Sequence, residues 1–199
     1  MKGWSTRELV TLAVFGALWG VSEMTLGAVL HALRLPLAGL VMSGVGMLIV
    51  LTAYRFVPRR GTVPTVGLVS ALLKAFSLGS IVLSPMIAIL AEALLAELGL
   101  ALTGGRPHRG PLALAGALGV LWSFFHAFIG QGLLAGRGMV EIYRRTLEAG
   151  ARLLHLDPQA VPIIVLALIV LHLAVGATAG ILACGLGRQL SHRLQAEGA

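Results

Sequence analysis

Residues 161–186 read VPIIVLALIVLHLAVGATAGILACGL, a run that contains no Asp, Glu, Lys or Arg. About 20 consecutive apolar residues suffice to cross the hydrocarbon core of a bilayer as an α-helix. Such a helix satisfies all of its backbone polar groups within the segment, which an isolated strand cannot do. The run therefore predicts a transmembrane helix, and the fold class depends on how many similar runs the chain carries.

Five further apolar runs precede this one. Across the 199 residues, 57% are hydrophobic and only 12% are charged, which is more apolar surface than a single soluble core can bury. We therefore predict an all-α membrane protein with six transmembrane helices in a single domain, 1–199. The first five segments run from about Glu8 to Leu30, Leu35 to Val57, Pro64 to Ser80, Val82 to Leu102 and Pro111 to Ala135, and the sixth from Val161 to Leu186.

A different pattern separates the fifth and sixth segments. From Met139 to Leu156, apolar residues such as Ile142 and Leu147 alternate with charged residues such as Arg144 and Glu148 at helical spacing. This pattern is typical of an amphipathic helix that lies on the membrane surface. It fits equally an ordinary connector and a lid over a binding site.

The basic residues between the apolar runs predict the orientation of the chain. One side collects nine of them and the other side five, four of which lie in the long loop before the last helix. Because cytoplasmic loops carry the excess of Lys and Arg, we expect both termini in the cytoplasm. The net charge of +7 therefore reports topology, and no nucleic-acid partner is expected. The nine are Lys2, Arg7, Arg55, Arg59, Arg60, Arg106, Arg109, Arg188 and Arg193; the five are Arg34, Arg137, Arg144, Arg145 and Arg152.

Ionisable side chains within the apolar runs are the first functional candidates, because a charge in hydrocarbon is costly unless it has a partner or faces a cavity. With a rise of about 1.5 Å per residue, five of them fall between the outer interface and the midplane: Glu23, Lys74, Glu92, His126 and His172. Lys74 and Glu92 flank a short turn, and either a structural ion pair or joint ligand binding would explain them.

Aromatic residues accompany two of these groups. Trp19 lies four residues before Glu23, and Trp122 lies four residues before His126, so each pair shares a helix face. An aromatic plane beside a carboxylate suits a cationic or heteroaromatic ligand, although helix packing would explain it equally. No short His or Cys spacing predicts a metal site, and no nucleophile or phosphate-loop motif predicts an enzyme.

Small residues form a second face on the first helix. Ala13, Ala17 and Gly20 lie within about a quarter turn of one another, which permits close approach of another helix. With six helices, about 200 residues and the stretch Ala13-Val14-Phe15-Gly16-Ala17, the chain resembles the S components of energy-coupling factor (ECF) transporters.

The resemblance implies a bacterial or archaeal cytoplasmic membrane and a transmembrane T component that docks on Ala13 and Ala17, driven by two cytoplasmic ATPases. It also implies a vitamin-like ligand held near the outer helix ends, with no resident cofactor. Trp19, Glu23, Glu92 and His126 are similar to the aromatic, Glu and His side chains of thiamine-binding members.

Two functional hypotheses follow. The first is a substrate-capturing subunit that binds a vitamin-like molecule through Trp19, Glu23, Lys74, Glu92, Trp122, His126 and His172, with uptake of haem or a cobalamin-type cofactor as a variant. The second is a membrane scaffold or assembly subunit without a ligand, in which Lys74 and Glu92 only fix a helical hairpin.

Overall fold

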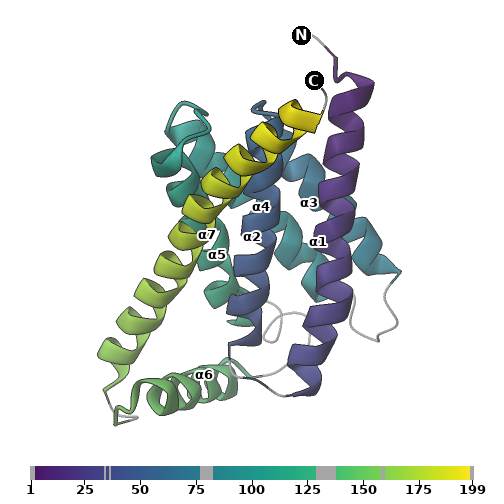
Figure 1. Cartoon of the computed structure of the whole chain (residues 1–199). Helices are drawn as coiled ribbons and strands as arrows, with labels where there is room; N and C mark the ends of the chain where they lie inside the picture. The colour runs from purple at the N-terminus through teal and green to yellow at the C-terminus, as the bar shows by residue number, and fades with distance from the viewer. Residues whose placement is uncertain are drawn as a thin grey trace.

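The computed structural model describes residues 3–33, 35, 37–76, 83–128, 138–157 and 160–197. Every regular element in these ranges is a helix. The helices pack into a bundle, and α6 lies across one end of it (Figure 1). The helices are α1 (Thr6–Ala32), α2 (Ala38–Phe56), α3 (Thr62–Ala75), α4 (Leu83–Leu102), α5 (Arg109–Phe128), α6 (Met139–Leu154) and α7 (Val161–Glu197).

The all-α fold is confirmed, but the prediction of six membrane spans is wrong. Among the described residues, four helices are long and apolar enough to cross a bilayer: Thr6–Leu30, Ala38–Phe56, Leu83–Leu102 and Val161–Arg193. Helix α3 has only 14 residues, or about 21 Å, against a hydrocarbon core of about 30 Å. Helix α5 is not one of the four, and residues 129–135 of the predicted fifth segment lie outside the described ranges.

Helix α2 lies at the centre of the bundle, where it contacts every other long helix. Its residues Met47, Val50, Leu51 and Ala53 are completely buried. Helix α1, by contrast, leaves a row of apolar side chains exposed along its length. In a bilayer those side chains contact lipid tails, so their exposure carries no penalty.

Helices α5 and α7 make the most extensive contact in the molecule, and glycine makes it possible. A Cβ on Gly116 would overlap the carbonyl oxygen of Gly176, and a Cβ on Gly180 would overlap that of Leu112. The two backbones therefore touch directly, as in the small-residue contacts of membrane helices.

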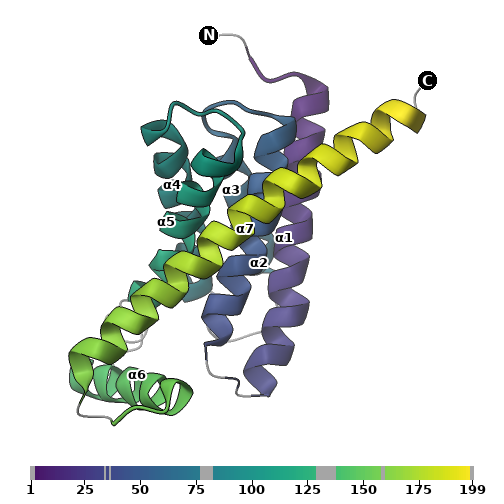
Figure 2. The ribbon, with the colours of Figure 1, turned by 60° about the vertical axis from the view of Figure 1, so that its left-hand side comes forward.

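Helix α7 is also much longer than predicted, because it continues from Leu186 to Glu197. Its 37 residues span about 55 Å, nearly twice the hydrocarbon thickness. The helix crosses the bundle at a steep angle (Figure 2). Both ends of the chain lie at the end of the bundle opposite α6.

Helix α6 confirms the predicted amphipathic segment. Its apolar face, with Leu147 and Ala151 buried, packs on Ile164 and Leu168 of α7. On its exposed face, Arg144 forms ion pairs with Glu141 and Glu148 at 3.0 and 2.7 Å. The apolar face thus covers other helices of the same chain.

Candidate functional site

Glu92 of α4 is the most deeply buried charged residue in the described ranges, with 4% of its surface exposed. Its Oε1 accepts a short hydrogen bond from the hydroxyl of Ser43 on α2. Ser43 is the side chain from which this carboxyl group accepts a hydrogen bond in the described part of the chain. A carboxyl group buried with one donor retains capacity for a further polar partner, and leaving that capacity unused in an apolar interior is unfavourable.

Lys74 does not pair with Glu92, so the structural ion pair suggested by the sequence is not formed. Instead, the Lys74 ammonium donates a hydrogen bond of 3.1 Å to the backbone carbonyl of Glu23 on α1. Lys74 occupies the last turn of α3, where its half-buried side chain reaches across to the neighbouring helix. The bond fastens the end of α3 to α1.

Glu23 itself is half-buried on α1, on the side facing α2. A Cβ on Gly27 would lie 3.8 Å from Glu23 Oε2 and 3.9 Å from the methyl group of Met42. Met42 is the neighbour of Ser43, which binds Glu92. The structure therefore brings Glu23, Lys74 and Glu92 to the same region, through contacts to α1 and α2.

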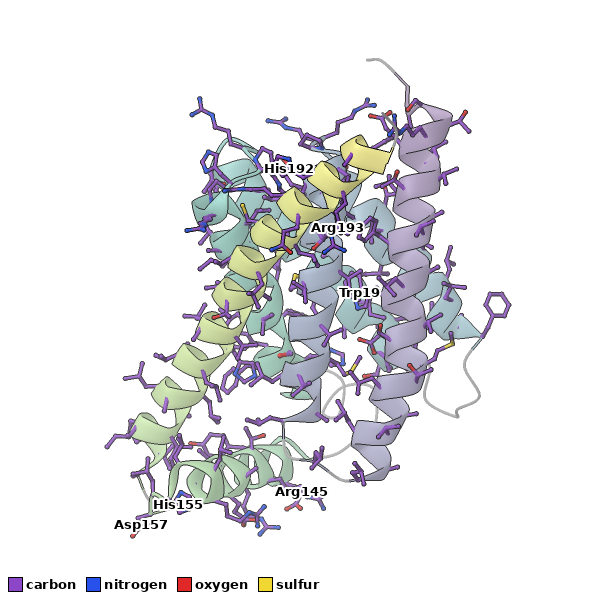
Figure 3. The ribbon with its side chains drawn as sticks, viewed as in Figure 1. Trp19, Arg145, His155, Asp157, His192 and Arg193 are labelled. Carbon is purple, nitrogen blue, oxygen red and sulfur yellow. The ribbon has the colours of Figure 1, made fainter. Side chains whose placement is uncertain are left out.

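Trp19 packs in the interior of the bundle. Its indole is completely buried and wedged against glycines of α2 and α3 (Figure 3). A Cβ on Gly46 would lie 2.5 Å from the indole nitrogen, and a Cβ on Gly67 would lie 3.7 Å from the ring. The ring fills the space between three helices, which agrees with the helix-packing alternative for Trp19.

Trp122 and His126 form the aromatic part of the site on α5. Their ring centroids are 6.3 Å apart, and His126 Nε2 lies 3.0 Å from the hydroxyl of Ser84 on α4. Trp122 Nε1 and His126 Nδ1 are buried without a hydrogen-bond partner among the described residues. Buried polar atoms in native proteins nearly always have partners, so two such nitrogens within one helical turn indicate a polar site.

Gly119 links this aromatic pair to Glu92. It lies one turn before Trp122 and two turns before His126, on the same side of α5. A Cβ on Gly119 would lie 3.2 Å from the backbone carbonyl of Glu92 and would overlap the sulfur of Met47. The Trp122 and His126 side of α5 therefore faces α2 and α4, and Ser43, Ser84, Glu92, Trp122 and His126 form what we call the polar cluster.

His172 lies outside the polar cluster. Its Nδ1 is 2.6 Å from the carbonyl oxygen of Leu168, and its ring meets Phe124 edge to face at 5.6 Å between centroids. Phe124 and His126 are two residues apart on α5, which places them on nearly opposite sides of the helix. His126 and His172, which the sequence placed at similar depth, therefore lie on different sides of α5. No group of three His, Cys, Asp or Glu that could hold a metal ion occurs within the described ranges.

The small-residue face of α1 is used largely inside the chain. Gly20 is buried, and a Cβ there would lie 3.0 Å from the Cβ of Leu73 on α3. Ala17 is half-buried, while Ala13 is exposed. Docking on a partner through Gly20 is therefore wrong, because α3 already covers it, and Ala13 is the member of the face that remains accessible.

Sequence reasoning missed two features of this region. The serines of the polar cluster drew no attention, although hydroxyls in apolar helices are candidates for contacts between helices. The contact between α5 and α7 was also missed, although its signal, Gly176 and Gly180 with three residues between them, is visible in the sequence.

The comparisons with known proteins do not assign a function to this chain. The chain matches no protein-family model, no curated protein and no solved structure.

Proposed function

We propose that the chain is the substrate-capturing subunit of an uptake transporter of the ECF type, which binds a vitamin-like small molecule at the polar cluster. The observation that carries this proposal is the partly satisfied chemistry of the cluster. Glu92 has one donor, and Trp122 Nε1 and His126 Nδ1 have no partner among the described residues. These groups would supply an acceptor, a donor and an aromatic surface to one ligand.

The position of the cluster supports entry from the side of α6. Ser43 and Glu92 lie about 8 and 14 Å from the starts of α2 and α4, and His126 lies two residues before the end of α5. All three of these helix ends belong to the end of the bundle that α6 crosses. In this proposal that end faces outward, both termini face the cytoplasm, and Ala13 contributes to the surface for a T component.

A ligand-free scaffold is the alternative, and specific contacts favour it. Trp19 packs in the interior of the bundle, and Lys74 donates a hydrogen bond to a backbone carbonyl of α1. If the whole cluster were structural, its polar groups would serve only to fix the helices. The two functions differ in whether the purified protein retains a small molecule.

The test is to purify the protein in mild detergent, denature it and identify released small molecules by mass spectrometry. Thermal shift with a panel of vitamins and haem extends the search to weaker ligands. The variant Glu92→Gln keeps the shape of the side chain and removes its charge. Glu97→Gln is the control for position, because Glu97 also has one hydrogen-bonded oxygen, bonded to Gly61 N at 2.8 Å, and one oxygen without a partner among the described residues, but lies toward the opposite end of the same helix.

We expect the wild-type protein and Glu97→Gln to retain the same compound, and Glu92→Gln to bind it at least about tenfold more weakly, as for the loss of a charged hydrogen bond. His126→Ala should also weaken binding, while Ser123→Ala on the same helix should not. Ser123 only bonds the Val120 carbonyl of its own helix. A monodisperse protein that retains no compound and shifts with none of the panel would support the scaffold instead.

A further inference from the structure

A groove lies at the end of the bundle opposite α6. This groove has a volume of about 460 Å³ and is bordered by the start of α1, the end of α2 and Leu190 of α7. Six of its lining residues are apolar, and the four polar ones come from the first residues of the chain in this groove, before and at the start of α1. The apolar residues are Val10, Val14, Phe15, Phe56, Val57 and Leu190, and the polar ones are Ser5, Arg7, Glu8 and Thr11. A largely apolar lining with polar residues gathered at one helix start suits an amphiphile better than a soluble metabolite.

The depth of the groove in the membrane limits what can fill it. The apolar span of α1 begins at Thr6 and that of α2 ends at Phe56. The groove is lined by residues on both sides of these two limits, so it lies where hydrocarbon gives way to headgroups. Val10 and Val14 are more than half exposed, so the groove is open beside the face of α1 that contacts lipid tails.

The charge of the groove is positive. Only two of its lining residues are charged, Arg7 and Glu8. Glu8 is neutralised by Arg59 at 3.0 Å and also accepts a hydrogen bond of 2.7 Å from Ser5 N. Arg7 is exposed and forms no ion pair with any described residue. The Arg7 guanidinium is therefore the charge in the groove lining that is available to pair with a bound molecule.

The surroundings reinforce this charge. Eight arginines lie at this end of the described chain, against three acidic residues, Glu8, Glu97 and Glu197, of which Glu8 and Glu97 accept hydrogen bonds. An anionic group near such a surface is attracted from several directions. The eight are Arg7, Arg55, Arg59, Arg60, Arg106, Arg109, Arg188 and Arg193.

We propose that this groove binds an anionic phospholipid, with one acyl chain between Val14 and Phe56 and the phosphate at Arg7. The site is distinct from the polar cluster and does not depend on the ligand proposed there. An acyl chain matches the apolar lining, and a guanidinium pairs with phosphate oxygens through two parallel hydrogen bonds. A zwitterionic lipid of the same chain length fits the apolar lining but gains less from the basic end.

The test is native mass spectrometry of the purified protein with 1-palmitoyl-2-oleoyl phosphatidylglycerol or the phosphatidylcholine of the same chains. Arg7→Gln removes this charge from the groove lining, and Arg60→Gln is its control, because Arg60 is an exposed arginine at the same end but outside the groove. Val14→Trp fills the groove, and Val21→Trp places the same ring on an exposed site of α1 outside it.

We expect wild type to bind phosphatidylglycerol more tightly than phosphatidylcholine, and Arg7→Gln to weaken phosphatidylglycerol binding about fivefold, as for one basic residue near an anionic surface. Arg60→Gln should change it much less. Val14→Trp should reduce binding of both lipids, unlike Val21→Trp. Equal binding of the two lipids, equal effects of both arginine variants, or a dimer that occupies the groove would each overturn the proposal.

Discussion

The hydrogen bond between Ser43 and Glu92 joins two helices in the interior of the bundle. Without it, the buried carboxyl group of Glu92 would lose the donor that Ser43 supplies. An unsatisfied buried polar group costs more free energy than a hydrogen bond contributes. Loss of this bond would therefore destabilise the fold mainly because it leaves the buried Glu92 carboxyl group without that donor. Ser43 is therefore the residue through which the stability of the polar cluster can be probed.

We predict that Ser43→Ala lowers the free energy of unfolding by about 1–3 kcal/mol, because it strips Glu92 of its donor. The double variant Ser43→Ala with Glu92→Leu should recover part of this loss, since it removes the orphaned carboxyl as well. Denaturant titration in detergent, followed by tryptophan fluorescence, measures both. Equal stability of Ser43→Ala and wild type would contradict the prediction.

The contact of Trp19 with Gly46 offers a second test at this scale. A Cβ at position 46 would lie 2.5 Å from the indole nitrogen, so Gly46→Ala must displace a fully buried ring. We predict a loss of about 1–3 kcal/mol, as for overpacking in a close-packed interior. Gly39→Ala is the control on the same helix, because no atom lies within 4 Å of its Cβ.

Gly39→Ala should be neutral or stabilising by up to about 1 kcal/mol, because alanine is the better helix former. Thermal unfolding of both variants, followed by the loss of the monodisperse peak in size-exclusion chromatography, compares them. If the two variants behave alike, the close packing of Trp19 on α2 is not a determinant of stability.

At the scale of elements, the crossing of α5 and α7 has no side chain between the backbones at Gly116, Gly176 and Gly180. We predict that Gly180→Ala separates the helices and lowers stability by at least about 1–3 kcal/mol, since its Cβ meets backbone rather than a movable side chain. Gly185→Ala, on the same helix with nothing within 4 Å, should have no such effect. The same chromatographic assay applies, and a Gly180→Ala protein as stable as Gly185→Ala would contradict the prediction.

The ion pairs on α6 lead us to expect that the stability of this helix depends on pH. Hydrogen bonds from Arg145 and then Arg144 lower the pKa of the Glu141 carboxyl below its ordinary value. A lowered pKa in the folded helix means that the ion pairs stabilise α6 above the unfolded pKa, near 4.3, and that this contribution is lost as the pH falls through the folded pKa.

We therefore expect the hydrogen-exchange protection of α6, corrected for intrinsic rates, to be constant from pH 7 to 5 and to decrease below about pH 4. Glu141→Gln should lower protection at pH 7 and reduce the change with pH. The control is α2, which has no carboxylate. Protection of α6 that is unchanged at low pH would contradict this assignment.

At the scale of the whole molecule, the helices could be predicted from the sequence, but the contacts between helices could not. The apolar runs predicted the long helices, and the alternation of arginines with leucines predicted α6, because each pattern depends only on residues close together in the sequence. The helical rise also placed Lys74 and Glu92 at suitable depths, but depth does not say which way two helices face each other. Lys74 therefore reaches Glu23 while Ser43 reaches Glu92. Trp19 shows the same limit, since its burial depends on glycines of two other helices.

The arrangement of the helices leads to a prediction about orientation. Both termini lie at the end that carries the eight arginines, whereas the end crossed by α6 has Arg144, Arg145 and Arg152 balanced by Glu141, Glu148 and Asp157 among the described residues. Because basic residues are retained in the cytoplasm, we expect both termini there. In a bacterial host, a C-terminal green fluorescent protein should fluoresce and a C-terminal alkaline phosphatase should be inactive. Phosphatase fused after Asp157 should be active, because that residue lies beside α6 (Figure 3). The opposite pattern would place the polar cluster on the cytoplasmic side and would exclude capture of a substrate from outside.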